Sequence, residues 1–294
     1  MKTMQAHEWM INYTRQTEWI DRRGIFLWIA FYTGGLGGGL YLVSLFFNSL
    51  WGMFLSWLII AVIKGGAHFI YLGRPLRFWR MVTRPGSSWL SRGIIFVLSF
   101  VVLAGAQMAF TYWMPGTAGE IIFKVLAGIA ALAVSVYTGF ILNTVKGVPF
   151  WNSSLLPLLF VSYGVMSGFG LAIVIALSGG DVNLATSETW SRWLLIFNTL
   201  LVVIYLLAAA NREATGKQSV MEQMRGHLAP VFWAGIVALG IVVPAVLAVF
   251  SYIVGEIATA LLVTGVACEI IGGLSLRYCI LKAGAYKPLV ARTS

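Results

Sequence analysis

Three polar side chains in the apolar stretches of this chain have the chemistry to hold a quinone head group: Lys64, His68 and Tyr137. Lys64 and His68 are four residues apart, so on a helix they share one face. An ammonium, an imidazole and a phenol can each hydrogen-bond a carbonyl oxygen, and the imidazole can also carry a proton. A lone histidine or tyrosine near a helix end can equally be an interfacial residue. A lysine in mid-span is harder to explain that way, because a charge in hydrocarbon costs at least ~2.5 kcal/mol.

A buried acid adds a second candidate for proton chemistry. Glu269 lies near the middle of the last apolar stretch, and Glu256 lies near its start. Glu269 and Lys64 together indicate either a proton path or a structural ion pair. Arg277 follows about two turns later and is expected to extend its side chain toward the membrane surface.

A dense group of arginines follows His68 in "YLGRPLRFWRMVTRPGSSWLSRG": Arg74, Arg77, Arg80, Arg84 and Arg92. Pro75 and Pro85 in the same segment predict a loop of fixed shape. Arginine binds carboxylates in a bidentate manner and stays charged, so the loop is a candidate docking surface for a partner. A plain cytoplasmic loop that follows the positive-inside rule would carry similar charges.

The sequence offers few ligands for haem or metal. Of its three histidines only His68 lies in a predicted span, whereas bis-histidine haem in a membrane bundle requires facing histidine pairs. Cys268 and Cys279 lie three turns apart on one predicted helix, too far for a disulfide, and no zinc or iron–sulfur spacing is present. We therefore expect neither haem nor metal in this protein.

The elements that must position these residues are predicted to be membrane-spanning helices. The sequence is 59% hydrophobic and only 10% charged, with a mean hydropathy of +0.86, whereas a soluble domain carries about 25% charged residues. A bilayer core requires about 20 apolar residues per helix. We predict an all-α integral membrane protein with eight spans, at residues 25–48, 51–72, 93–113, 120–143, 151–178, 190–211, 229–251 and 257–280.

Eight spans place both termini on one side of the membrane, here called side A. Side B then carries Arg192 and Lys124, and Lys64 lies within a span. The remaining 17 of the 20 Lys and Arg residues fall on side A: Lys2, Arg15, Arg22, Arg23, Arg74, Arg77, Arg80, Arg84, Arg92, Lys146, Arg212, Lys217, Arg225, Arg277, Lys282, Lys287 and Arg292. The positive-inside rule makes side A cytoplasmic, and this distribution favours a membrane-surface bias over nucleic-acid binding.

Glycines and prolines give the expected internal organisation. "GGLGGG" in the first span and "YGVMSGFG" in the fifth predict close helix packing, and Pro157 and Pro244 are expected to kink their helices. Residues 1–24 lack the apolar core of a signal peptide and are expected to lie at the interface. We predict two four-helix bundles, at 25–143 and 144–280, followed by a cytoplasmic tail at 281–294.

The loop "YLGRPLRFWRM…SSWLSRG", the glycine-rich first span, "VYTGFILN" and "GGLSLRY" resemble the NrfD / polysulphide reductase membrane-subunit family over essentially the whole sequence. The resemblance implies a haem-free subunit of the prokaryotic cytoplasmic membrane that binds menaquinone or ubiquinone. It also implies two partners: a four-cluster, ferredoxin-like iron–sulfur subunit, and a catalytic subunit of the molybdopterin, hydrogenase or multihaem type.

The resemblance also suggests site residues. In some relatives the tyrosine of the YTG motif, here Tyr137, holds the quinone together with Asn and His in the first span. Those positions match Phe26 and Ala30, whose side chains cannot hydrogen-bond, so His68 becomes the substitute partner. The arginine segment would then receive the iron–sulfur subunit. The alternative function is a secondary transporter or a proton-translocating module with a midplane site around Lys64 and Glu269.

Overall fold

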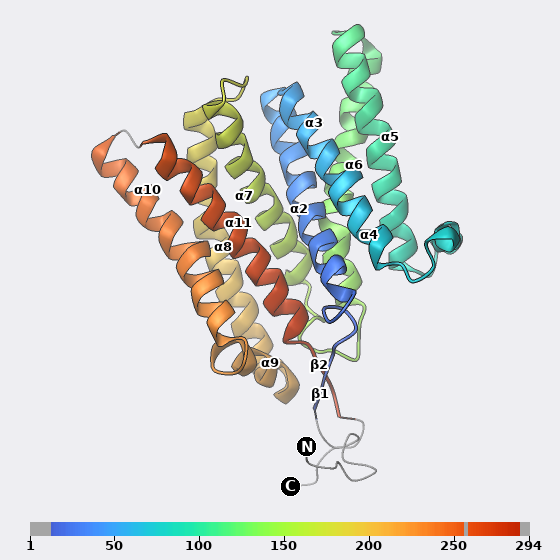
Figure 1. Ribbon diagram of the computed structural model, residues 1–294, viewed down its shortest axis with the longest axis vertical. Helices are drawn as coiled ribbons and strands as arrows, with labels where there is room; N and C mark the ends of the chain where they lie inside the picture. The colour runs from blue at the N-terminus through green and yellow to red at the C-terminus, as the bar shows by residue number, and fades with distance from the viewer. Residues whose placement is uncertain (1–12, 256–257, 289–294) are drawn as a thin grey trace.

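The computed structural model describes residues 13–255 and 258–288, and most of these residues lie in helices. Eight helices within this part of the protein are long and apolar enough to cross a membrane (Figure 1). The prediction of an all-α protein with eight spans is confirmed. The spans are α2 (Gly24–Phe47), Leu50–Tyr71, α5 (Trp89–Trp113), α6 (Ala118–Asn143), α7 (Leu155–Leu177), α8 (Leu184–Arg212), Val231–Val254 and α11 (Thr259–Lys282).

Two of the spans change their hydrogen-bonding pattern along their length. The second consists of α3 (Leu50–Leu58), the π-helix η1 (Ile59–Lys64) and α4 (Gly65–Tyr71). The seventh consists of the π-helix η3 (Val231–Val242) and α10 (Val243–Val254). Both remain continuous helices. Stretches of π-helix are rare and often mark functional sites.

Short elements join the spans at one end of the bundle. They are the 3₁₀-helix η2 (Pro75–Val82), α9 (Ala214–Met224), and the strands β1 (Thr14–Arg15) and β2 (Ala285–Tyr286), which pair antiparallel. The strand pair holds the beginning and the end of the described residues together beside this end of the bundle (Figure 1). The predicted interfacial segment and tail extend into residues 1–12 and 289–294, and these residues, like Glu256, lie outside the described part.

Side-chain caps explain where several spans begin. Ser49 accepts a hydrogen bond from the backbone N–H of Gly52, and Thr117 accepts one from Glu120. Asn183 accepts one from Thr186, so α8 begins six residues before the predicted start at residue 190. The polar first turn of α8 has low hydropathy, and it is stabilised by this cap rather than by lipid.

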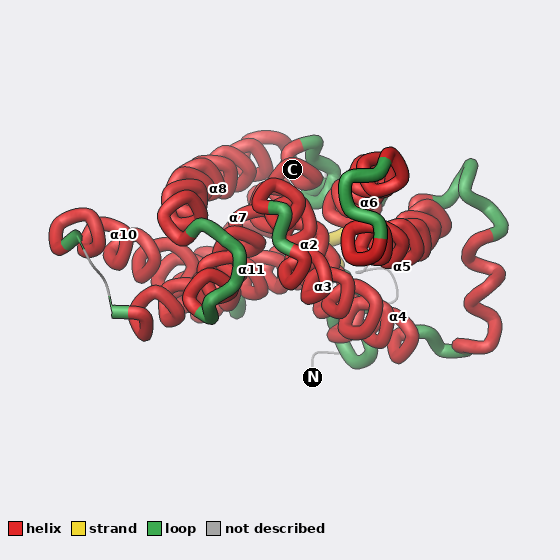
Figure 2. The backbone as a smooth tube through the Cα atoms, turned by 90° about the horizontal axis from the view of Figure 1, so that it is seen from above, coloured by secondary structure: helices red, strands yellow, loops and turns green. Residues whose placement is uncertain are grey.

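The helices α2 and α7 lie side by side at the centre of the bundle, between α5 and α6 on one side and α8, α10 and α11 on the other (Figure 2). Their glycines meet directly. A Cβ atom on Gly168 would lie 2.6 Å from the carbonyl carbon of Gly39, and one on Gly164 would lie 2.5 Å from the oxygen of Gly35. The expected packing role of the two glycine-rich motifs is therefore confirmed. The division into bundles 25–143 and 144–280 stays a prediction.

The two prolines have different surroundings. Pro157 was expected to kink its helix, but α7 begins at Leu155, so this proline occupies the first turn, where the missing N–H has no helical partner. That expectation was wrong, because the predicted span began four residues too early. Pro244 lies where the seventh span changes from π- to α-helix.

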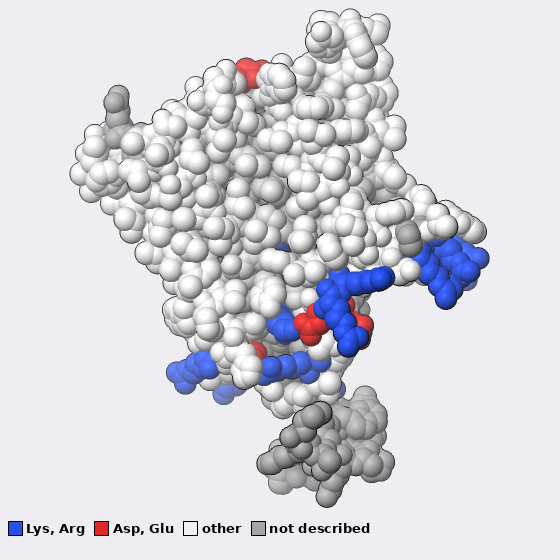
Figure 3. All heavy atoms as spheres, viewed as in Figure 1, with Lys and Arg blue, Asp and Glu red and all other residues white. Residues whose placement is uncertain are grey.

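Basic side chains gather at one end of the molecule (Figure 3). On the face shown, Lys and Arg lie near the ends of α9 and α11 and over the projecting segment η2, whereas the opposite end carries almost none. The terminal strands β1 and β2 lie at the same end, so the basic end is side A.

Candidate functional site

A cavity of about 190 Å³ lies among the second, third and fourth spans, toward side A. We call it the Lys64 cavity. Its wall is almost entirely apolar, with Lys64, His68 and Tyr137 as its polar side chains. Phe69 and Leu98 belong to the same wall and are about half exposed on the outer surface of the bundle. An apolar cavity with a few convergent polar groups is typical of small-molecule sites.

Lys64 is fully buried at the last position of the π-helix η1. Its Nζ donates hydrogen bonds to the carbonyl oxygen of Ala30 at 2.9 Å and to the hydroxyl of Tyr137 at 2.8 Å. The same atom lies 4.8 Å from the centre of the Tyr137 ring. Within the described residues no carboxylate lies close enough to form an ion pair with Lys64.

Tyr137 is held rigidly by its neighbours. Its ring packs so closely on α5 that a Cβ atom on Gly93 would lie 2.6 Å from the ring carbon Cδ2, and Phe96 packs at 6.5 Å between ring centres. Its hydroxyl oxygen accepts the hydrogen bond from Lys64. No hydrogen bond in the described part of the protein uses the hydroxyl of Tyr137 as a donor. This O–H group is thus available to a ligand in the cavity.

His68 completes the polar side of the cavity. Its Nδ1 lies 3.1 Å from the carbonyl oxygen of Lys64, one turn earlier. A carbonyl oxygen only accepts, so Nδ1 carries the proton and Nε2 of the neutral ring is left as an acceptor. The structure therefore brings the three sequence-predicted residues Lys64, His68 and Tyr137 to one cavity.

The first span contributes through its backbone at this point. Ala30, which matches a histidine position in the family pattern, is fully buried and presents its carbonyl oxygen to Lys64. Phe26 lies one turn earlier and is half-buried. Neither side chain takes part in the polar cluster.

Residues 73–92, which we call the arginine loop, cover one side of the Lys64 cavity. Phe78 and Met81 from η2 line the cavity. The side chains of the predicted docking arginines are exposed at Arg74, Arg77, Arg80 and Arg84. The loop therefore presents apolar side chains to the cavity and cations to the outside.

Arg92 differs from the other arginines of the loop. Its guanidinium donates to the carbonyl oxygens of Pro85 at 2.7 Å and Gly86 at 2.8 Å, and it stacks on Trp89 at 4.6 Å from the ring centre. Arg92 therefore fixes the conformation of the loop through these hydrogen bonds. A loop of fixed shape is what Pro75 and Pro85 predicted.

Glu269 lies in a separate cavity of about 60 Å³, called here the Glu269 cavity, between α8, α10 and α11. It is 4% exposed and accepts a hydrogen bond from the hydroxyl of Ser191 at 3.3 Å. The two cavities share no lining residue, and no ion pair joins Glu269 to Lys64 in the described residues. The ion-pair interpretation of these two residues therefore finds no support, and the proton path stays a prediction.

Arg277 does not extend toward the membrane surface, and that expectation was wrong. It is 3% exposed and donates to the carbonyl oxygens of Phe31 on α2 and Phe160 on α7, the latter at 3.1 Å. The rings of Phe160 and Tyr32 lie 4.6 and 5.4 Å from its guanidinium carbon. The glycine face of α2 leaves room for this side chain, since a Cβ atom on Gly35 would collide with it.

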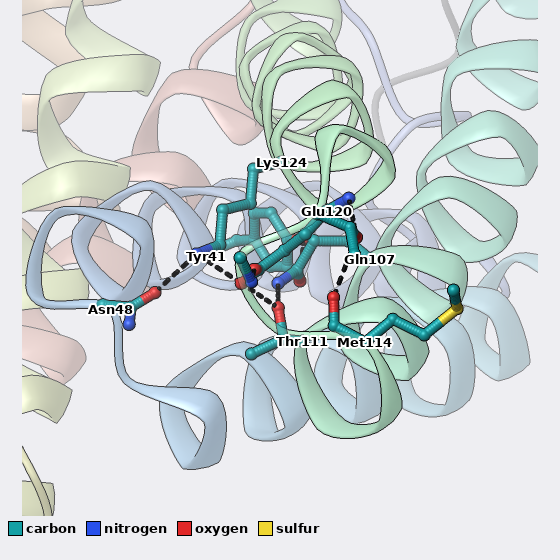
Figure 4. A network of polar contacts seen from close by, with 9 residues as sticks. Tyr41, Asn48, Gln107, Thr111, Met114, Glu120 and Lys124 are labelled. Atoms are coloured by element: carbon teal, nitrogen blue, oxygen red, sulfur yellow. Dashed lines mark hydrogen bonds and ion pairs between the residues drawn. The ribbon is translucent and has the colours of Figure 1, made fainter.

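Sequence reasoning also missed a polar network at the side B end of the first four spans (Figure 4). The hydroxyl of Tyr41 donates to Gln107 at 2.8 Å, Gln107 donates to Thr111 at 2.8 Å, and Thr111 donates to Glu120 at 2.9 Å. Lys124 pairs with Glu120 at 2.7 Å. The spacing of Glu120 and Lys124, and the polar Gln107 within an apolar span, were the available signals.

The family model described as "Polysulphide reductase, NrfD" matches residues 24–288. The protein is 26% identical over 255 residues to "Protein NrfD" of Escherichia coli, covering 76% of its own length and 79% of that relative. It is 23% identical over 272 residues to one of the chains of the polysulfide reductase of Wolinella succinogenes, covering 81% and 84%. It is 30% identical over 199 residues to one of the subunits of the sulfite dehydrogenase of Allochromatium vinosum, covering 62% and 58%.

Proposed function

Because the protein belongs to the polysulphide reductase, NrfD family, we propose that it is the quinone-reactive membrane subunit of a multisubunit oxidoreductase. Electrons would pass between a quinone in the Lys64 cavity and an iron–sulfur subunit docked on the arginine loop, and from there to or from a catalytic subunit. Relatives named as parts of a polysulfide reductase and of a sulfite dehydrogenase support an assembly of this kind. The observation that carries the proposal is the hydrogen bond from Lys64 to Tyr137 inside an apolar cavity.

The residues around the Lys64 cavity fit a quinone. The apolar wall suits its ring, and the half-exposed Phe69 and Leu98 suit a prenyl tail that extends into lipid. The hydroxyl of Tyr137 can donate to a carbonyl oxygen of the head group, and Nε2 of His68 can accept from a hydroxyl of the reduced ring. When bound, the quinone supplies coupled electron and proton transfer.

Lys64 orients the Tyr137 hydroxyl and places a positive charge beside it. Such a charge in an apolar site stabilises negative charge that develops on a bound oxygen, since it is fixed in position and water does not screen it. His68 can hold a proton at Nε2 that leaves or reaches the ring oxygen. The protein has the groups for proton transfer, whereas the electrons require a redox partner.

The quinone site is tested by Tyr137→Phe, alone and combined with His68→Ala. Each lost hydrogen bond should weaken binding of a quinone analogue by roughly 2- to 10-fold, equivalent to about 0.5–1.5 kcal/mol. Titration calorimetry on the protein in lipid measures the affinity, and Tyr112→Phe, at an exposed tyrosine, is the matched control. Unchanged affinity and full quinol-linked turnover in the double variant would move the site elsewhere.

The arginine loop is the proposed docking surface for the iron–sulfur subunit. Its outer cations lie over the cavity that would hold the quinone, so a partner bound there would lie next to the site of electron transfer. Trp79, in the same 3₁₀-helix, does not line the cavity and is about half exposed, so it can add apolar contact. The charge asymmetry further supports side A as the cytoplasmic side of a prokaryotic membrane. If an impermeant external reagent labels Ser87→Cys in intact cells, side A faces outward and this assignment is wrong.

Charge reversal tests the docking surface. Arg77→Glu with Arg80→Glu should release the iron–sulfur subunit, because both arginines are exposed and carry no structural side-chain hydrogen bond among the described residues. Co-purification in detergent at low and high salt measures retention of the partner. Arg225→Glu, at another side A arginine, is the matched control. Stoichiometric retention of the partner in the double variant at both salt concentrations would show that docking occurs elsewhere.

A further inference from the structure

The carboxyl group of Glu269 has an oxygen with no partner. Ser191 donates to Oε2, whereas Oε1 is buried and has no hydrogen bond within the described residues. The adjacent cavity of about 60 Å³ can hold a few water molecules, since one water occupies roughly 10–15 Å³ by this measure. Glu269 is one of the residues that line this cavity, so its carboxyl group lies next to space that water can occupy.

This arrangement is not general for buried acids in this protein. Glu120 is 6% exposed, comparable to Glu269, but both of its oxygens have partners (Figure 4). Oε1 accepts from Lys124 at 2.7 Å and from Thr111 at 2.9 Å, and Oε2 accepts from the N–H of Gly116 at 2.7 Å. The Glu120 network is complete and fixes the fold locally, whereas the surroundings of Glu269 are incomplete.

A hydrogen-bonded pair borders the Glu269 cavity on side B. Arg192 donates to Glu188 at 2.5 Å and to the hydroxyl of Ser251 at 2.8 Å, which joins α8 to α10. The side chain of Arg192 is 34% exposed, so it contacts both the cavity and the outside. Arg192, Glu188 and Ser251 all line the Glu269 cavity near the side B ends of α8 and α10.

Buried polar groups continue from Glu269 toward the centre of the bundle. The hydroxyl of Ser167 on α7 is buried and has no partner among the described residues. Tyr32 on α2 and Tyr163 on α7 both lie against Gly273, one turn from Glu269 on α11. The titratable, charged and hydroxyl groups that face Glu269 from the elements packed around it are Tyr32, Tyr163, Glu188, Ser191, Arg192 and Ser251.

We propose that Glu269 is a proton-binding site that exchanges with the aqueous phase of side B, and that the Arg192–Glu188 pair controls its access to water. A proton from water converts the carboxylate to a carboxylic acid, and its release restores the carboxylate. No redox step is involved at this site. The inference rests on the proposed function in one respect: it gives a quinone-linked protein a second site for protons. Proton binding at Glu269 can be measured without quinone.

Infrared difference spectroscopy on the protein in lipid, recorded between high and low pH, tests the proposal. A carbonyl-stretch band of a buried carboxylic acid should appear as the pH falls, disappear in Glu269→Gln, and remain in Glu120→Gln. After transfer to D₂O, the band should shift roughly 2- to 5-fold faster in Arg192→Leu than in the wild type, because a partly exposed ion pair restrains the opening only modestly. The band should respond to pH on side B of oriented proteoliposomes.

Several outcomes would overturn the proposal. They are a band that persists in Glu269→Gln, a band that responds to Na⁺ at constant pH, or access from side A. Glu269→Asp, which keeps a carboxyl group, serves as a second variant if Glu269→Gln does not fold. Affinity for the quinone analogue, measured in the same samples, should not change in Glu269→Gln, and the band should not change in Tyr137→Phe. A failure of the proton site and a failure of the quinone site are thereby distinguishable.

Discussion

Two buried cations lie against neighbouring glycines of α2, Lys64 against Gly34 and Arg277 against Gly35. Both are almost fully buried, and neither forms an ion pair with a carboxylate of the described residues. Their surroundings differ. Lys64 donates to one backbone carbonyl and one tyrosine and borders a cavity. Arg277 is bonded by carbonyls from two helices, is covered by two aromatic rings, and lines neither of the two cavities described above.

The difference separates a residue that joins helices from a residue that serves a ligand. A guanidinium can satisfy several acceptors in fixed directions and is weakly hydrated, which suits a fully enclosed position between α2, α7 and α11. An ammonium on a flexible stem can move within a cavity and meet a bound molecule. We therefore expect substitutions at Arg277 to act on the stability of the fold, and substitutions at Lys64 to act on binding.

Arg277→Met should give the largest loss of stability. It removes two hydrogen bonds to a charged group, each worth about 1.5–3 kcal/mol, together with contacts to two aromatic rings. We expect the free energy of unfolding to fall by roughly 3 kcal/mol or more. Thermal unfolding in detergent measures the change, with Arg225→Met, at an arginine outside the spans, as the control. A wild-type transition would show that Arg277 does not join the helices.

Alanine at the two glycines should give a smaller and unequal loss. In Gly35→Ala the new Cβ lies 2.9 Å from Nη1 of Arg277, which is enclosed, so overpacking should cost about 1–3 kcal/mol. In Gly34→Ala it lies 2.6 Å from Nζ of Lys64, which can withdraw into the cavity, so the cost should stay below about 1 kcal/mol. Gly66→Ala, with no atom near the new Cβ, is the control for helix propensity. Equal losses at Gly34 and Gly35 would contradict the comparison.

The same two cations illustrate what the sequence could predict. The spacing of Lys64 and His68 places both on one helix face, and the hydropathy pattern places Tyr137 at the same depth, so this cluster followed from local rules. The inward position of Arg277 did not, because it depends on which face of α11 meets the glycines of α2. The π-helix that ends at Lys64 and the network of Tyr41, Gln107 and Glu120 likewise depend on contacts between different helices.

The start of α7 and the role of Arg92 were missed for a related reason. The predicted span began at the apolar Trp151, but residues 151–154 belong to the connection before α7. The indole of Trp151 is buried and donates to the carbonyl oxygen of Ile280 at 2.7 Å. The count of arginines in the loop indicated a cationic surface. It could not show that Arg92 bonds the loop's own carbonyls while Arg77 and Arg80 remain exposed.

Lys64→Met should have the smallest effect on stability and a clear effect on binding. An ammonium buried without an ionic partner carries a large desolvation cost, larger than that of the weakly hydrated guanidinium. Its removal recovers that cost and offsets the two lost hydrogen bonds, so the free energy of unfolding should change by less than about 1 kcal/mol. The Tyr137 hydroxyl would lose the donor that orients it, and the cavity would lose its cation. Affinity for a quinone analogue should therefore fall about 10-fold, equivalent to ~1.4 kcal/mol and close to the value of a hydrogen bond from a charged group.

Thermal unfolding and titration calorimetry on the same preparation separate the effect on stability from the effect on binding, and Lys217→Met, at an exposed lysine, is the control. If Lys64→Met unfolds as readily as Arg277→Met, both cations join helices and the distinction between them fails.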